Sequence, residues 1–359
     1  MHQAADGALA RIRLPGGALT AGQLEALAGA ATQYAAGTLE LTARGNIQLR
    51  GITDTKAVAD VVAHAGLLPS PTHERVRNIV ASPLSGRIGP YRDVRPWIAE
   101  LDAAIQADPA LAGLPGRFMF SIDDGRGDVS GLGADVGVHA FGDAVALVLA
   151  GRDTGIRIED AEVVPMMLAV ATRFNEVRDN AWRVSELADP SVLTGDLAVS
   201  AEPGATWPPV LRPPVGWLEQ NDGRVTLGAA VPLGVLEASV ALYLAAIEKP
   251  LVITPWRSVF VCDLDEGVAD VALRVLAPQR LIFDANSPWL NVSSCTGQPG
   301  CAHALADVRA DAAESVETAE PGTHRHYVGC DRACGSPPSG EVLVATGDGY
   351  RLREAPPVG

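Results

Sequence analysis

Two closely spaced pairs of cysteines near the C-terminus constrain this chain more than any other feature of its sequence. Five residues separate Cys295 from Cys301, and three separate Cys330 from Cys334. Glycine and proline lie within or beside both loops, so the backbone can turn tightly there instead of continuing as a helix or strand. Four thiolates on two such loops can surround one cuboidal iron–sulfur cluster, because soft sulfur ligands select iron–sulfur or zinc over harder ions.

Two other uses of these cysteines are a structural zinc site and a pair of disulfides. Zinc sites usually repeat a knuckle with two residues between its cysteines, and the spacings here fit that pattern poorly. A chain of 359 residues with five cysteines is also far from the disulfide-dense secreted class. The cluster is therefore the favoured interpretation. The fifth thiol, Cys262, is expected to be a small buried residue of a strand.

The composition is typical of a globular protein with two or three domains, since 47% of the residues are hydrophobic and 20% are charged. No apolar run reaches the length that spans a bilayer, and the first residues lack the features of a secretion signal. We expect a monomer in the cytoplasm, where thiols stay reduced. The net charge of −15 argues against nucleic acid or an anionic membrane as a partner.

One segment opposes this acidic balance. Between Arg44 and Arg95 there are eight basic residues and four acidic ones. The chain has only two lysines, Lys56 and Lys249, so codon bias explains the use of arginine but not its clustering. Because the arginine fork binds carboxylates and oxyanions through two hydrogen bonds, the segment favours an anion site over a merely solvated face.

The hydrophobic pattern predicts that one unit of strands and helices occurs twice. In each copy, helical spacing is followed by alternating strands around a tight turn that carries an arginine. These arginines, Arg44 and Arg257, are 213 positions apart, which indicates an internal duplication. The predicted elements are a strand at 11–14, helices at 20–36, 54–64 and 236–247, and strand pairs around 45–46 and after 251. Thr20 can cap the first helix, in which Leu24 and Leu27 recur at helical spacing.

Further elements are predicted between and after the two copies. The proline-rich stretch 201–216 is interpreted as an extended linker rather than packed structure. A helix at 302–314, directly after Cys301, would point its positive N-terminal end at the cluster. The other predicted elements are strands at 118–123 and 144–150 and a helix at 162–177.

Three motifs together resemble the nitrite/sulfite reductase superfamily: Leu-Thr-Ala-Arg-Gly-Asn-Ile-Gln-Leu-Arg-Gly-Ile at 41–52, Arg-Val-Arg-Asn-Ile at 75–79, and the two cysteine pairs. The resemblance covers essentially the whole chain. It implies an α+β, pseudo-twofold duplicated sulfite-reductase-like fold, in which two ferredoxin-like half-domains alternate with two α/β cluster or cofactor domains. The expected boundaries are 1–72 and 217–278 for the half-domains, 73–200 and 279–359 for the α/β domains, and 201–216 for the linker.

The same resemblance implies the site residues. Cys295, Cys301, Cys330 and Cys334 would bind a [4Fe-4S] cluster. Catalytic residues are not assigned. The arginines expected to bind an anionic substrate are Arg44 and Arg77, which match two family positions, together with Arg50, Arg117 and Arg257.

One departure from the family pattern bears on the reaction. The sulfite and nitrite reductases carry two lysines one residue apart after a Leu-Pro, where this chain has Arg117 and Met119. A methionine cannot deliver protons, so anion reduction is disfavoured. The stretch Thr-Pro-Trp-Arg-Ser at 254–258 resembles the precorrin-3B synthase branch of the family.

That branch implies oxygen-dependent hydroxylation of precorrin-3A at C20 with lactone formation, in aerobic cobalamin biosynthesis. The substrate would be an anionic tetrapyrrole, with a mononuclear non-haem iron beside the cluster and a reductase, ferredoxin or NADH system as electron donor. A siroheme-dependent assimilatory sulfite or nitrite reductase and a non-catalytic carrier remain as alternatives. His303, His324 and His326 are expected to be surface or hydrogen-bonding residues rather than iron ligands.

Overall fold

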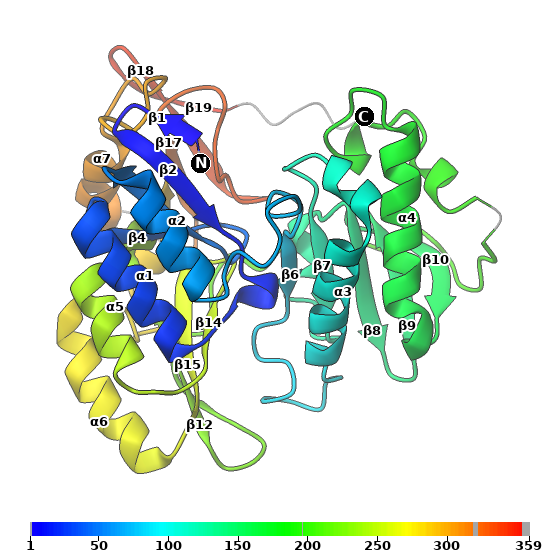
Figure 1. Cartoon of the computed structure of the whole chain (residues 1–359), viewed down its shortest axis with the longest axis horizontal. Coiled ribbons are helices and arrows are strands. Elements are labelled where there is room, and N and C mark those ends of the chain that lie inside the picture. The colour runs from blue at the N-terminus through cyan, green and yellow to red at the C-terminus, as the bar shows by residue number, and fades with distance from the viewer. Residues whose placement is uncertain (1, 196, 319–321, 354–359) are drawn as a thin grey trace.

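A computed structural model describes residues 2–195, 197–318 and 322–353. Residue 1 of the first predicted domain, residue 196 of the second and residues 319–321 and 354–359 of the last therefore lie outside the described part. In that part the chain forms four β-sheets flanked by helices (Figure 1). None of its helices combines the length and apolar character needed to cross a membrane.

The first sheet has the strand order β1-β2-β5-β4-β13. Helix α1 begins after Thr20, whose hydroxyl accepts a hydrogen bond from the Gln23 amide, while the Gln23 side chain bonds the Thr20 amide in return. This confirms the predicted cap. The elements are β1 (His2–Ala4), β2 (Gly7–Ile12), α1 (Ala21–Tyr34), β4 (Thr38–Leu41), β5 (Ile47–Ile52) and α2 (Thr55–His64).

A second sheet repeats this arrangement with the order β11-β12-β15-β14-β3. Its strands follow the same sequence of hairpin, helix, hairpin and helix as those of the first sheet. The predicted duplication is therefore confirmed. The elements are β11 (Gly216–Glu219), β12 (Val225–Ala230), β13 (Val235–Glu237), α5 (Ala238–Ala245), β14 (Leu251–Ile253), β15 (Ser258–Leu264) and α6 (Glu266–Leu276).

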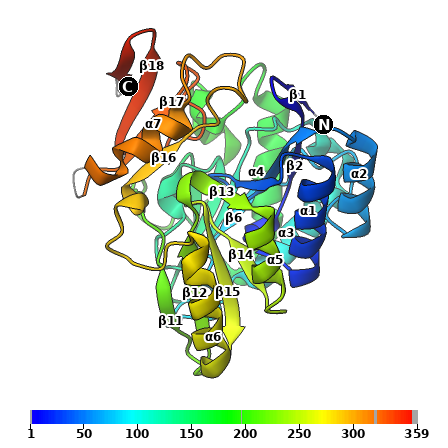
Figure 2. The same ribbon diagram turned by 90° about the vertical axis from the view of Figure 1, so that its left-hand side faces the viewer.

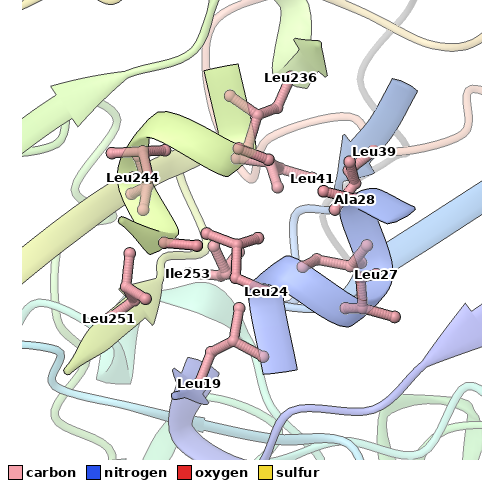
Figure 3. Close-up of a cluster of buried hydrophobic side chains, with 14 of the residues drawn as sticks. Leu19, Leu24, Leu27, Ala28, Leu39, Leu41, Leu236, Leu244, Leu251 and Ile253 are labelled. Carbon is pink, nitrogen blue, oxygen red and sulfur yellow. The ribbon is translucent and has the colours of Figure 1, made fainter. Parts of the chain in front are cut away.

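Each of these sheets takes its last strand from the other half of the chain. Strand β13 pairs with β4, while β3 (Ala18–Leu19) pairs with β14. The exchange joins both halves around one core, in which Leu24 and Leu27 of α1 and Leu244 of α5 are among the buried residues (Figure 3). The two half-domains are consequently a single packed body, and neither could bury its sheet without the other.

The two α/β domains also match one another. In one, β6, β7 and β8 run parallel and β9 returns antiparallel, and in the other β16, β17, β18 and β19 do the same (Figures 1 and 2). The predicted fold class is confirmed by this second repeat. The first has β6 (Ile79–Ala81), α3 (Arg95–Ala107), β7 (Phe120–Asp123), β8 (Val136–Phe141), β9 (Ala144–Leu149), β10 (Arg152–Ile158) and α4 (Val163–Val177). The second has β16 (Val292–Ser294), α7 (Val308–Ser315), β17 (Arg325–Val328), β18 (Glu341–Thr346) and β19 (Gly349–Leu352).

The proline-rich stretch is extended, as predicted, but it is packed, and that part of the prediction is wrong. The indole of Trp207 stacks on His139 with ring centroids 4.4 Å apart. The Val210 carbonyl accepts a hydrogen bond of 2.7 Å from the Trp256 indole. Backbone bonds also join Ala205 and Gly204 to Asp153. Aromatic stacking and backbone hydrogen bonds anchor the stretch to the rest of the protein. The proline content alone did not reveal these contacts.

Candidate functional site

A cavity of about 2050 Å³ lies where three parts of the molecule meet. One wall is the exposed face of β2 and the turn between β4 and β5. A second wall comes from loops of the first α/β domain, and the third comes from the cysteine loops and the strands beside them. The cavity thus joins the predicted substrate residues to the predicted cluster residues.

Arginine dominates the lining of this cavity. Twelve arginines line it against three carboxylates, although the whole chain carries a net charge of −15. No lysine lies among the lining residues. The arginines are Arg11, Arg13, Arg44, Arg75, Arg77, Arg117, Arg178, Arg183, Arg257, Arg309, Arg332 and Arg353.

Most of these arginines lack an acidic partner. Only Arg77, Arg183 and Arg309 pair with a carboxylate, so within the described residues nine cavity arginines form no ion pair. Elsewhere most arginines are paired, because a buried or half-buried guanidinium without a counter-ion is costly. An anionic ligand with several acidic groups would supply the counter-ions that these arginines lack.

Arg13 and Arg44 show how these cations are held. Arg13 donates to the Glu74 carbonyl at 3.1 Å, and Arg44 donates to the carbonyls of Gly116 and Arg117 at 3.2 and 3.1 Å. Burial lowers the pKa of both guanidinium groups to about 10, and in Arg13 the charge of Arg44 adds to the effect. Both remain cationic at neutral pH and are oriented by neutral carbonyls.

Other predicted residues lie in different environments. Arg77 lines the cavity, but its guanidinium forms a two-point ion pair with Asp102 at 2.6 and 2.8 Å. Arg117 is exposed at the cavity edge. Met119 lines the wall with 6% of its surface exposed and presents no proton donor there. Its backbone amide donates a hydrogen bond of 2.8 Å to the Asp135 carboxylate.

The pseudo-twofold relation between Arg44 and Arg257 differs from the prediction by one residue. The two turns have the same backbone hydrogen bonds, from Thr42 to Asn46 and from Thr254 to Ser258. By these bonds Arg257 occupies the place of Gly45, and both have positive φ, +55° and +64°. The offset is therefore 212 positions. The equivalent of Arg44 is Trp256, so the second turn does not repeat the first arginine.

Arg257 instead reaches the second cysteine loop. Its Nη2 donates to the Gly335 carbonyl at 3.0 Å, next to Cys334 in the chain. Burial lowers its pKa to about 10, and the neighbouring Cys295 opposes that shift. Arg257 therefore places a positive charge between the cavity and the cysteines.

The four predicted cluster ligands lie on two adjacent loops, after β16 and after β17. All are free thiols, as is the buried Cys262 of β15, so the disulfide alternative is not seen. The loops touch directly, since the Gly329 amide donates to Cys295 Sγ at 3.3 Å. Burial raises the pKa of Cys334, and the negative charges of the other three cysteines raise it further.

This donor set fits a [4Fe-4S] cluster. Four thiols on adjacent loops would be stabilised as thiolates by a cationic iron core, and Arg257 and the Gly329 amide suit the negative overall charge of such a cluster. Across the described residues, no three His, Cys, Asp or Glu side chains converge tightly enough to hold a single metal ion. The mononuclear iron therefore stays a prediction, and the choice of a cluster over zinc rests on the spacing of the cysteines.

The predicted helix at 302–314 is wrong at its start, because α7 begins at Val308. Residues 302–306 bond to the cysteine loops instead: Leu305 donates to the Gly329 carbonyl, and Gln298 donates to the Ala306 carbonyl, both at 2.9 Å. Backbone groups used in this way cannot close helical turns. The first turn of α7 still faces the first cysteine loop, since a Cβ on Gly297 would lie 3.0 Å from the Val308 amide.

The three histidines are exposed or hydrogen-bonded, as predicted, while their exclusion as iron ligands stays a prediction. His303 is exposed, whereas Ser293 Oγ lies 2.8 Å from both His324 Nε2 and His326 Nδ1. His326 Nε2 lies 3.1 Å from the Cys334 carbonyl. Burial and the charge of Arg257 lower the pKa of His324 to about 4 and that of His326 to about 3. They form a neutral hydrogen-bonded chain between the cavity and the second cysteine loop.

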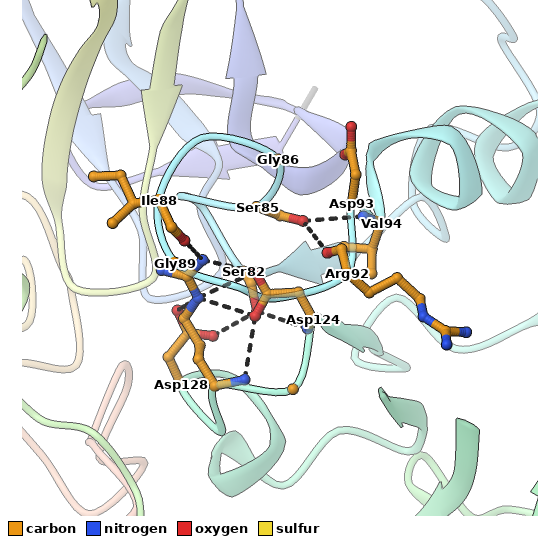
Figure 4. Close-up of polar contacts among 12 residues, drawn as sticks. Ser82, Ser85, Gly86, Ile88, Gly89, Arg92, Asp93, Val94, Asp124 and Asp128 are labelled. Carbon is orange, nitrogen blue, oxygen red and sulfur yellow. Dashed lines mark hydrogen bonds and ion pairs between the residues drawn. The ribbon is translucent and has the colours of Figure 1, made fainter. Parts of the chain in front are cut away.

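The first α/β domain has no cysteines at the matching position. Its loops after β6 and β7 are joined by Ser82, which donates to Asp128 at 2.6 Å and accepts from the Asp124 amide (Figure 4). Arg126 forms an ion pair with Asp124 at 2.7 Å. Burial, together with the charge of Asp123, raises the pKa of Asp128 to about 7. A polar network therefore takes the place of a cluster in this half.

Several cavity residues escaped the sequence reasoning. Arg11 and Arg13 project from β2 or just beyond it, and Arg183, Arg332 and Arg353 come from distant segments. No signal in a single sequence distinguished them, since Asp331 and Glu354 stand directly beside Arg332 and Arg353. Arg50 has the opposite outcome, because it was predicted to bind substrate but does not line the cavity.

Comparisons with known proteins agree with this geometry. Residues 2–62 match the family model of the nitrite/sulfite reductase ferredoxin-like half domain. The chain is 29% identical to a precorrin-3B synthase from a Sinorhizobium species, over 98% of this chain and 80% of that protein. It is 25% identical to the chloroplastic ferredoxin–nitrite reductase of Zea mays, over 90% of this chain and 67% of that protein.

The fold also matches a solved structure, that of the Mycobacterium tuberculosis NirA protein. The TM-score is 0.79 at 20% sequence identity, and the match covers 96% of this chain and 73% of NirA. The half-domain match, the similarity over nearly the whole chain and the shared fold thus all point to the nitrite/sulfite reductase superfamily.

Proposed function

We propose that this protein is an iron–sulfur oxidoreductase of the precorrin-3B synthase type, which hydroxylates precorrin-3A at C20 with dioxygen and closes a lactone. The observation that carries the proposal is that nine arginines without an ion pair in the described part of the chain converge on one cavity, which Cys295 and Cys334 also line. The similarity to a precorrin-3B synthase over nearly the whole chain supports it.

The cavity suits a large acidic macrocycle. Its volume of about 2050 Å³ exceeds the roughly 300–1,000 Å³ usual for small-ligand sites. Arginine forks distributed over three walls could each bind one carboxylate, which would fix the tetrapyrrole plane and its rotation within the site. A small anion such as sulfite would use only a few of them.

Cys295, Cys301, Cys330 and Cys334 would hold the cluster, which when bound supplies electrons one at a time. Two electrons from an external donor and two protons from solvent balance the reaction, in which one atom of dioxygen enters the substrate as a hydroxyl group and the other leaves as water. The arginines bind and orient the substrate. Met119 keeps its part of the wall free of proton donors.

The alternative is a siroheme-dependent sulfite or nitrite reductase, favoured by the similarity to the nitrite reductase of Zea mays. Reducing either anion by six electrons consumes several protons, which positioned acids usually deliver. The positions expected for two lysines hold Arg117 and Met119, and neither side chain can transfer a proton at neutral pH. The hydroxylase is therefore the better-supported candidate.

Absorption spectra of the purified protein, with and without dithionite, test both candidates. We expect the broad absorption of a [4Fe-4S] cluster that bleaches on reduction, without siroheme bands, and oxygen uptake when precorrin-3A and a reductant are added. Stoichiometric siroheme together with turnover of sulfite or nitrite would refute the hydroxylase in favour of the reductase.

A further inference from the structure

Arg50 lies on the face of β5 that points away from the core. Gln48, two residues before it, lines the cavity, whereas Ile47 and Leu49 are buried between the sheet and the helices. A bulge follows at Gly51, where φ is +61° and the register to β2 shifts. This local geometry turns Arg50 toward the first cysteine loop rather than into the cavity.

The guanidinium of Arg50 makes three short contacts. Its Nε and Nη2 each donate to Asp6 at 2.9 Å, and Nη2 also donates to the Gly300 carbonyl at 2.5 Å. Gly300 immediately precedes the predicted ligand Cys301. A Cβ on Gly300 would lie 3.1 Å from Asp6 Oδ2 and 3.3 Å from Arg50 Nη2, so the close approach depends on a glycine there.

A second carboxylate extends the contact to α7. Glu40 Oε1 accepts from Arg309 Nη2 at 2.5 Å and lies 3.8 Å from Arg50 Nε. The side chains of Arg50 and Glu40 are 9% and 8% exposed. Asp6, Arg50, Glu40 and Arg309 therefore form a half-buried, charge-balanced bridge between the first half-domain and the domain that carries the cysteines.

The pseudo-twofold relation supplies a natural comparison. The equivalent joint in the other half is the ion pair between Arg87, in the loop after β6, and Asp263 of β15, with distances of 2.9 and 3.0 Å. Its side chains are 10% and 24% exposed, against 9% and 25% for Arg50 and Asp6. The two ion pairs match in geometry and burial, but only that of Arg50 touches a cysteine loop.

We propose that Arg50 is a positioning residue for the iron–sulfur cluster: it fixes the loop that carries Cys301, and its charge raises the reduction potential. The inference rests on the cluster part of the proposed function and not on the identity of the tetrapyrrole. Cluster potentials respond to nearby charge and hydrogen bonding. Without the guanidinium, Asp6 would leave an unbalanced negative charge beside the cluster, which would oppose the addition of an electron.

The test uses the purified holoprotein and the variants Arg50→Gln, Arg50→Lys and Arg87→Gln. We measure iron and sulfide per chain, the EPR signal of the reduced cluster and its midpoint potential. Arg50→Gln should lower cluster content and shift the potential to more negative values. Arg50→Lys keeps the charge and should restore most of the potential. Arg87→Gln should lower the melting temperature about as much as Arg50→Gln does, without changing the midpoint potential of the cluster.

Two results would overturn the inference: a wild-type potential and iron content in Arg50→Gln, or an equal potential shift in Arg87→Gln. If Arg50→Gln does not fold, Asp6→Asn takes its place: it keeps the shape of the side chain but removes a negative charge beside the loop, so the midpoint potential should shift to more positive values. An unchanged potential in Asp6→Asn would then reject the role of this ion pair. A wild-type protein that binds no cluster would reject the proposed function as well.

Discussion

Replacing Arg44 by alanine tests whether the cavity binds an anionic macrocycle. Its guanidinium lies at the turn between β4 and β5, where two carbonyls orient it and, among the described residues, no carboxylate pairs with it. Since burial lowers its pKa only to about 10, the side chain is cationic at pH 7. It is therefore positioned to form a charge-assisted hydrogen bond with a substrate carboxylate.

The magnitude follows from that bond. Loss of a hydrogen bond to a charged group costs about 1.5–3 kcal/mol, so the Kd for precorrin-3A should rise about tenfold to about 150-fold. The two bonds to Gly116 and Arg117 join the half-domain to the first α/β domain, and the loss of each should lower the free energy of unfolding by up to about 1.5–3 kcal/mol on the same scale. Binding and folding are therefore both expected to weaken, and each is measured separately.

The assay is an anaerobic titration of the holoprotein with precorrin-3A, followed by absorption, beside urea unfolding of the ligand-free protein. Arg274→Ala is the control, because it removes the same charge from an exposed ion pair with Asp270 on α6. Its Kd should match that of the wild type. An Arg44→Ala protein that binds within about twofold of wild type, or an equal loss in Arg274→Ala, would refute a direct contact.

Three further outcomes are expected. Cys330→Ser should lose the cluster, since one missing thiolate opens the cube, and full iron and sulfide content by chemical analysis would contradict the ligand assignment. The folded-state pKa of Asp128 is about 7, above its ordinary value, so ionising this carboxyl group opposes folding. The free energy of unfolding should therefore fall as pH rises from 4 to 7, by at most about 1.4 kcal/mol per pH unit. Asp128→Asn should remove that component from urea unfolding measured across this range, and an unchanged pH profile would show that Asp128 does not cause it. Gly17→Ala should cost about 2 kcal/mol or more, because φ is +75° and the added Cβ would lie 1.9 Å from the Ile253 carbonyl oxygen; a melting temperature equal to wild type would contradict the strand-exchange geometry.

Local sequence signals were sufficient for much of the fold. The cap at Thr20, the spacing of Leu24 and Leu27, and the alternation around Gly45 each depend on neighbouring residues, and the structure confirms all three. The duplication was visible because both halves repeat that local pattern. The exchange of β3 and β13 was not, since two-residue and three-residue strands carry almost no periodic signal.

The arginine-rich segment shows where local reasoning stops. Of its members, Arg87, Arg92 and Arg95 form ion pairs with carboxylates of the protein, at Asp263, Asp160 and Asp93. Conversely, Arg13 and Arg332 reach the cavity from outside the segment. Clustering along the chain therefore predicted that an anion site exists, but not which guanidinium groups remain available.

By itself the sequence determined the cysteine pairs, the repeated half-domain and the chemistry of the available side chains, because these depend on residue type and short spacing. The tertiary structure alone decided that Arg50 contacts the loop of Cys301, that Trp256 rather than Arg257 is equivalent to Arg44, and that unpaired arginines meet in one cavity. Such outcomes depend on which carboxylate or carbonyl, distant in sequence, lies within hydrogen-bonding distance of each guanidinium in the folded protein. Packing of the chain determines these partners, since electrostatic interactions and hydrogen bonds act over a few ångströms in space rather than along the sequence.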